Sequence, residues 1–104
     1  MPTIEKTKKV AQKASNMYDV ERRKIYNTSR WKRLRKRKFS INPLCEMCLK
    51  EGKTTLAEDI HHIQSFMQTE DRWERMALAY DIGNLMSLCK KHHQMIHNQK
   101  HSGV

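Results

Sequence analysis

Apolar residues are sparse along this chain, and their spacing changes from one segment to the next. In residues 30–39 they recur at helical intervals within a strongly polar run, at Trp31, Leu34 and Phe39. Lysine or arginine fills seven of the nine positions from 30 to 38. This pattern predicts a helix with a narrow apolar side and a broad basic surface.

The borders of this helix are marked by residues with strong local preferences. Thr28 or Ser29 is suited to cap its first turn, and Asn42-Pro43 would end it. The preceding residues 1–27 lack glycine, and only a few apolar positions lie at helical spacing: Val10, Ala14 and Met17. We therefore expect a basic extension over 1–27, helical or mobile, followed by one domain over 28–104.

The second half alternates between extended and helical patterns. Residues 54–63 are typical of extended chain, and residues 85–88 form a second short apolar stretch. Between them, residues 70–80 predict a helix whose packing face carries Trp73, Met76, Ala77 and Tyr80. The last segment, 90–100, has neither glycine nor proline and should be helical. The chain therefore predicts a small α+β domain with a two-stranded antiparallel sheet.

Charge is distributed unevenly. Residues 1–44 contain 14 lysines and arginines against three acidic residues, whereas residues 45–104 contain seven against eight. The whole positive excess of this chain, whose net charge is +10, thus lies ahead of the first cysteine. Such asymmetry favours contact with a polyanion, nucleic acid first and an acidic membrane surface second. The expected DNA-binding residues are Arg30, Lys32, Arg33, Arg35 and Lys36.

The hydrophobic core must be small, because only 38% of the 104 residues are hydrophobic. A core of this size rarely contributes more than about 3–5 kcal/mol, so a covalent or metal staple is expected. The first ten residues lack the apolar run of a signal peptide, and no stretch approaches transmembrane length. We expect a cytoplasmic protein. In that compartment three cysteines indicate metal rather than disulfides.

Four residues form two half-sites of identical spacing. Cys45-x-x-Cys48 is followed about forty residues later by Cys89-x-x-His92. Zinc takes four such ligands in a tetrahedron, which leaves no open position for water. The pattern predicts a structural zinc ion, with free buried thiols as the alternative.

Five of the six histidines fall in two groups, His61-His62 and residues 92–97. If His92 binds zinc, His93 and His97 remain at i and i+4 on one helical face, able to bind a second ion. His61 could add a third ligand. Neighbouring side chains of a strand point to opposite sides, so His61 and His62 must serve different tasks.

These residues resemble the HNH endonucleases, whose core is called the ββα-metal fold. Ile60-His61-His62-Ile63 is similar to the first motif of the family and Asn84-Leu85 to the second. The third motif is matched by residues 89–93, and the step from Asn84 to His93 and His97 is similar to the colicin-type nucleases. The overall resemblance is closest to the short phage-type HNH proteins.

The resemblance implies a role for each residue. His62 would be the general base, and Asn84 would brace the loop that holds it. His61, His93 and His97 would hold one catalytic divalent ion, which could be Mg²⁺, Mn²⁺, Ni²⁺ or Zn²⁺. Many family members have Asp in place of His61, and a neutral ligand there favours softer ions than magnesium. Many also have Cys in place of His92, so His93 remains an alternative zinc ligand. Glu58 and Asp59 are expected to be solvated turn charges.

The resemblance therefore implies a metal-dependent hydrolase of double-stranded DNA that leaves 5′-phosphate and 3′-hydroxyl ends. Packaging proteins of phages, such as terminase or portal, are the implied partners. Two alternatives remain. The chain could be a non-enzymatic, zinc-stabilised DNA-binding module, or an RNA-cleaving nuclease with the same core.

Overall fold

Two short strands lie at the centre of the molecule. The computed structural model describes residues 17–102, so the predicted helix positions Val10 and Ala14 lie outside the described part. Strand β1 (Asp59–His62) pairs antiparallel with β2 (Leu85–Leu88), with Asp59 opposite Leu88 and His62 opposite Leu85. The predicted two-stranded sheet is thus confirmed. Only four residues of the expected extended segment 54–63 belong to a strand, although Leu56 forms an isolated bridge with Leu44.

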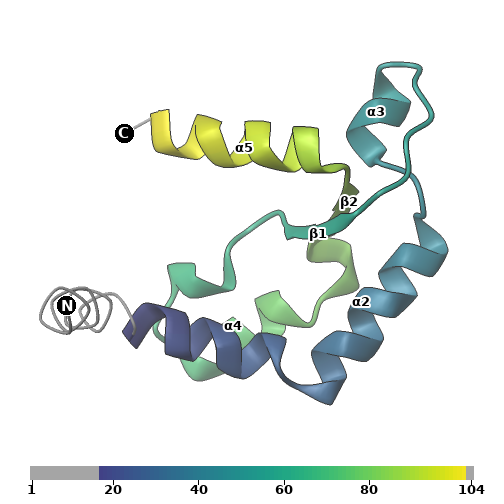
Figure 1. The fold of residues 1–104 in the computed structure, drawn as a ribbon. Helices are drawn as coiled ribbons and strands as arrows, with labels where there is room; N and C mark the ends of the chain where they lie inside the picture. Colours follow the sequence, from purple (N-terminus) through teal and green to yellow (C-terminus); the bar gives the residue numbers. More distant parts are fainter. Residues whose placement is uncertain (1–16, 103–104) are drawn as a thin grey trace, which may run out of the picture.

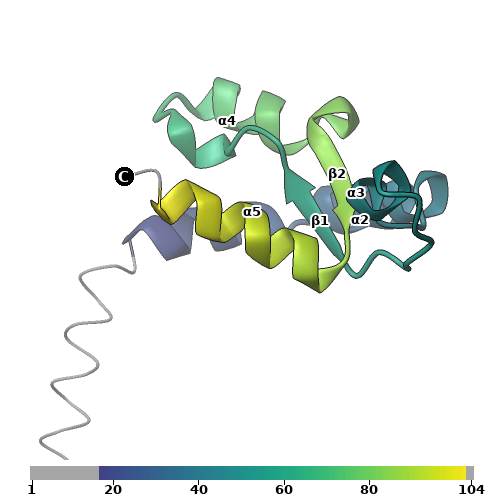
Figure 2. The ribbon, with the colours of Figure 1, turned by 90° about the horizontal axis from the view of Figure 1, so that it is seen from above.

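Helices cover both faces of this sheet (Figure 1). Helix α5 (Lys90–Ser102) lies on one face, and α2 (Ser29–Ile41) lies with a helix over residues 17–26 on the other. Figure 2, which views the molecule from above, shows α5 beside the two strands. The connection between the strands contains η1 (Phe66–Gln68), α4 (Arg72–Ala79) and η2 (Ile82–Asn84). The observed architecture is the predicted small α+β fold.

Helix α2 begins and ends where its sequence predicts. The Thr28 side chain accepts a hydrogen bond from the Trp31 backbone N–H (3.1 Å), and Asn42 is the C-terminal cap. Trp31 is buried, as expected for the apolar side. Lys38 is buried as well, and its Nζ lies 3.2 Å from Glu46 Oε2 and 2.8 Å from Asn42 Oδ1. This ion pair joins α2 to the short helix α3 (Glu46–Lys50) and removes one lysine from the basic surface.

The predicted packing face of α4 is confirmed at Met76 and Tyr80 and wrong at Trp73 and Ala77. Trp73 is 74% exposed and Ala77 is also exposed, whereas Ala79 is fully buried and Met76 and Tyr80 are half-buried. The inward stripe therefore runs through Met76, Ala79 and Tyr80. The short helix is anchored at its C-terminal end, so its first turn projects Trp73 into solvent. None of the helices in the described part of the chain is long and apolar enough to cross a membrane.

Candidate active site and metal centre

Three cysteines and one histidine gather at the end of the sheet where α3 meets the start of α5. The ligand atoms of Cys45, Cys48, Cys89 and His92 lie within 4.8 Å of one another, and all four residues are buried. His92 Nδ1 lies 3.3–3.6 Å from the three sulfur atoms, and Cys48 Sγ lies 3.8 Å from Cys89 Sγ. A tetrahedral zinc site with Zn–S bonds of about 2.3 Å has edges of about 3.8 Å. The four residues are therefore spaced to hold a zinc ion.

Local structure turns these ligands toward one another. Cys45 is the N-cap of α3, and its sulfur accepts a hydrogen bond from the Cys48 backbone N–H (3.4 Å). After α3 the chain reverses at Gly52, whose φ of 77° favours glycine. The Lys53 N–H then donates to the Cys48 carbonyl (2.8 Å), which closes the knuckle. Cys89 lies between β2 and α5, and His92 lies in the first turn of α5.

Contacts around this cluster affect the protonation of its ligands, which decides how they can bind a cation. Burial would raise the pKa of Cys45, but hydrogen bonds from the backbones of Cys89 and Cys48 lower it to about 7. His92 Nε2 donates to Glu51 Oε2 (2.9 Å), so Nδ1 can carry the lone pair toward the sulfurs. Glu51 and then Cys89 raise the pKa of His92 to about 9, so a bound ion must displace a proton. The sequence offered no signal for this role of Glu51.

Four further histidines, His61, His62, His93 and His97, line a pocket of about 420 Å³. His61 faces α5, where its ring centroid lies 5.3 Å from that of His93. His62 faces α2, so the two neighbours point to opposite sides as expected from strand geometry. The described lining consists of Tyr18, Arg22, Tyr26, Ile60, His61, His62, Ser65, Phe66, Met67, His93 and His97.

His62 is held on several sides although it lines this pocket. Its ring is stacked on Trp31 at 4.9 Å and 26°, and its edge contacts Phe66 at 4.9 Å. Nε2 lies 3.1 Å from the carbonyl oxygen of Ala79. Because a carbonyl only accepts, Nε2 carries the proton, and the lone pair of the neutral ring is on Nδ1. Burial lowers the pKa of His62 below its ordinary value, so the ring is neutral at pH 7.

Asn84 ties together the two segments that surround His62. Its Oδ1 accepts the Gln64 backbone N–H, and its Nδ2 donates to the carbonyls of Gln64 and Leu78, each at 2.9 Å. Leu78 precedes Ala79, whose carbonyl holds the His62 ring. One buried amide thus fixes the end of β1 relative to the end of α4.

His93 contacts Asp59, a residue that the sequence predicted to be a solvated turn charge. Its Nδ1 donates to Asp59 Oδ2 (3.0 Å), and Lys90 Nζ lies 3.3 Å from Asp59 Oδ1. Burial opposes ionisation of Asp59, but its contacts with His93 and Lys90 lower its pKa. The expectation that Asp59 is a solvated turn charge is therefore wrong. Asp59 and His61 are two residues apart on one strand, so strand alternation placed both toward α5.

The described histidines do not form a second cluster as tight as the cysteine site. His61, His93 and His97 line one pocket, but their ligand atoms are not all within 4.8 Å of one another. The orientation of His93 is nevertheless defined, because Asp59 accepts the proton of Nδ1 and leaves the lone pair on Nε2.

Comparison with known proteins identifies this arrangement. The family model described as HNH endonuclease matches residues 45–99, more than half of the chain. The chain belongs to the HNH endonuclease family. The matched segment contains the cysteine cluster, both strands and the histidines of the pocket. The predicted family is therefore confirmed, and with it a nuclease-type core.

A solved structure supports the same assignment for the fold. The HNH endonuclease of the deep-sea thermophilic bacteriophage GVE2, crystallised with manganese ion, superimposes with a TM-score of 0.70 and 27% sequence identity. The similarity covers 88% of this chain and 94% of the phage protein. No curated protein matches the sequence.

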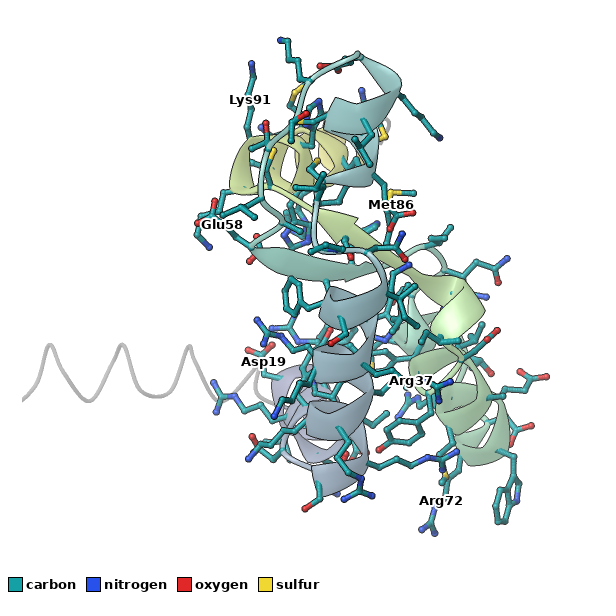
Figure 3. All side chains as sticks on the ribbon, turned by 90° about the vertical axis from the view of Figure 1, so that its right-hand side faces the viewer. Asp19, Arg37, Glu58, Arg72, Met86 and Lys91 are labelled. Carbon is teal, nitrogen blue, oxygen red and sulfur yellow. The ribbon has the colours of Figure 1, made fainter. Side chains whose placement is uncertain are left out.

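The basic residues of α2 lie outside the pocket of this HNH core. Figure 3 looks onto α2, with Arg37 on its side toward α4. The five predicted DNA-binding residues are exposed. The guanidinium of Arg30 lies 4.2 Å from the ring centroid of Tyr80, and that of Arg35 lies 4.7 Å from that of Phe39. Helix α2 therefore has one basic side with Arg30, near Tyr80, and another with Arg35. No residue of either side lines the histidine pocket.

Proposed function

We propose that this chain is a metal-dependent endonuclease that hydrolyses DNA phosphodiester bonds with one catalytic divalent ion and His62 as the general base. The observation that carries the proposal is the fixed, neutral imidazole of His62 at a pocket lined by three further histidines. A non-enzymatic DNA-binding module would need neither feature. The products would carry 5′-phosphate and 3′-hydroxyl ends.

In this proposal, Nδ1 of His62 takes a proton from the water that attacks phosphorus. The bond from phosphorus to the 3′ oxygen then breaks, and the 3′ oxygen is protonated by solvent. A base must be neutral before the reaction, and the lowered pKa of His62 meets this condition. The Trp31 stack and the Ala79 carbonyl restrict ring rotation, which keeps Nδ1 in one direction. Asn84 supports the base by fixing the backbone around it.

His61, His93 and, from the next turn of α5, His97 would hold the catalytic ion, through Nε2 in the case of His93. Such an ion stabilises negative charge on the phosphate and on the leaving 3′ oxygen. Three imidazoles are ligands that favour Ni²⁺ or Zn²⁺ over Mg²⁺. The structural ion at Cys45, Cys48, Cys89 and His92 would be Zn²⁺, because thiolates and imidazole in a tetrahedron suit that metal.

The decisive experiment incubates supercoiled plasmid with purified protein and Mg²⁺, Mn²⁺, Co²⁺, Ni²⁺ or Zn²⁺ in turn. We expect nicked or linear DNA with at least one added ion and none with chelator. Structured RNA under the same conditions tests the alternative substrate. Binding of plasmid without cleavage in every ion would favour the non-enzymatic module and contradict this proposal.

We propose that the exposed basic residues of α2 contact DNA phosphates: Arg30, Lys32, Arg33, Arg35 and Lys36. Lys32, Arg35 and Lys36 can be replaced by Gln without loss of helix propensity. Each phosphate contact adds about −0.9 to the slope of log affinity against log salt. The triple variant should therefore flatten the slope by up to about 2.7. The measurement is DNA affinity over a salt series in a His62→Ala background.

An unchanged slope would mean that this side of α2 is only solvated. Arg30, Arg33 and Arg37 then provide a second triple variant on the side of α2 that lies toward Tyr80. Cleavage at saturating DNA should change much less than cleavage at low DNA in the first triple variant. The reason is that none of its three residues lines the histidine pocket.

The phage origin of the similar structure supports a phage or prophage setting, in the host cytoplasm. In that setting terminase or portal proteins would be the partners. Direct binding of the purified chain to these proteins, compared with binding of the His62→Ala variant, tests this part. If neither the wild type nor the variant binds them, the proposal of a packaging partner is wrong.

A further inference from the structure

One wall of the histidine pocket comes from outside the segment that matches the family. Tyr18, Arg22 and Tyr26 lie four residues apart on the helix over 17–26, and all three line the pocket with the histidines of β1 and α5. The family match begins only at residue 45. The basic extension therefore contributes directly to the candidate active site.

Arg22 is the one permanently charged residue among the described residues of the lining, which includes no Asp or Glu. The basic side chains of α2 are absent from this lining. A DNA phosphodiester that enters the pocket carries a negative charge, which grows as the attacking water adds to phosphorus. A guanidinium presents a planar fork of N–H donors that matches two phosphate oxygens.

The contacts of Arg22 leave its charge accessible. Its side chain is 46% exposed, and its Nη2 lies 3.7 Å from Oδ1 of the half-buried Asp19, one helical turn earlier. Pairs of this kind are weak and yield readily to a stronger anion. The guanidinium carbon lies 6.0 Å from the ring centroid of Tyr26, which itself lies 6.1 Å from that of His62. The Tyr26 ring is therefore a neighbour of both Arg22 and the proposed base, His62.

We propose that Arg22 binds the scissile phosphate, donating hydrogen bonds to its non-bridging oxygens, and stabilises the charge that develops there. This inference rests on the proposed nuclease function and adds a residue from the extension to its active site. Arg22 would stand on the helix 17–26 side of the phosphate, with His61 and His93 on the α5 side. Such a donor contributes about 10²–10³-fold when it acts on the transition state.

The chain offers a matched control in Arg23, which is exposed on the same helix and does not line the pocket. Single-turnover cleavage is measured at saturating plasmid for wild type, Arg22→Gln, Arg22→Lys and Arg23→Gln. We expect Arg22→Gln to be about 10²-fold slower than wild type. Arg22→Lys should recover part of the loss, because it restores the charge but not the fork. The cleavage rate of Arg23→Gln should remain within about threefold of the wild-type rate, because an exposed charge away from the pocket contributes little.

Equal rates for Arg22→Gln and Arg23→Gln would overturn the proposal. A defect in Arg22→Gln that disappears at saturating DNA would also overturn it, because Arg22 would then be a general backbone contact. Zinc content and circular dichroism verify that each variant is folded. Failure of the proposed function looks different: the wild type itself would not cleave in any metal ion.

Discussion

Replacement of His62 by alanine is expected to lower the rate of DNA cleavage by about 10²-fold or more, while the fold and DNA affinity are retained. His62 is the imidazole whose proton is fixed on Nε2 by the Ala79 carbonyl, at 3.1 Å. Alanine removes the only group proposed to accept the proton of the attacking water. The measurement is single-turnover cleavage of plasmid at saturating DNA and metal.

Because His62 packs against Trp31 and Phe66, its removal also affects packing, and the two effects must be separated. Added imidazole should restore part of the cleavage by His62→Ala if a base is missing, and none if the fold has changed. Zinc content and plasmid affinity should stay near the wild-type values. Undiminished cleavage by the variant would show that His62 is not the base.

The pH dependence of the same reaction gives a second readout. Only the neutral imidazole can accept a proton, so kcat/KM at saturating metal should rise with pH and then level off. Burial lowers the pKa of His62 below the ordinary value of 6.5, so the midpoint of this rise should lie below that pH. A rate that falls between pH 6 and pH 8 would contradict the assignment.

Several elements of this fold could be predicted because each of them has a strong local signal. Thr28 and Asn42-Pro43 define the ends of α2, and the spacing of cysteines indicates the metal cluster. Alternation along β1 predicted that His61 and His62 would separate to opposite faces. These signals operate within a few residues, which makes them visible in the sequence.

Features that depend on tertiary contacts could not be predicted in the same way. The exposure of Trp73 follows from the anchoring of α4 at Ala79, which no periodicity of a short helix reveals. The roles of Asp59 and Glu51 require the distance to a histidine more than thirty residues away. Likewise, Arg22 and Arg23 are equivalent in the sequence, and only the fold places one of them at the pocket.

Three histidines at different positions share one kind of hydrogen bond. An oxygen acceptor holds one ring nitrogen of each: the Ala79 carbonyl for His62, Glu51 for His92 and Asp59 for His93. In each case the acceptor fixes the proton and so directs the lone pair of the other nitrogen. His92 and His93 are neighbours in α5, so the cluster that orients the first turn of this helix also positions His93 at the pocket.

We expect the metal cluster to contribute more to the stability of this domain than its small apolar core does. Replacement of Cys48 by serine is expected to leave the protein largely unfolded and without bound zinc. Zinc binding by such sites contributes on the order of 10–16 kcal/mol in finger peptides. A core of this size supplies only about 3–5 kcal/mol. Here the buried core around the site consists largely of its own ligands, with Leu88 and a few half-buried neighbours.

The matched control for this variant is Leu49→Ser, at the next position of α3. Leu49 is 49% exposed and contributes no ligand, so this variant should keep its zinc and unfold near the wild-type temperature. Metal analysis, circular dichroism on heating and a two-dimensional NMR spectrum are recorded for both variants. A well-dispersed spectrum of Cys48→Ser without bound zinc would disprove the structural role of the ion. Removal of zinc from the wild type by a strong chelator should reproduce the unfolding of Cys48→Ser, because both treatments leave the same buried thiols and imidazole without their ion.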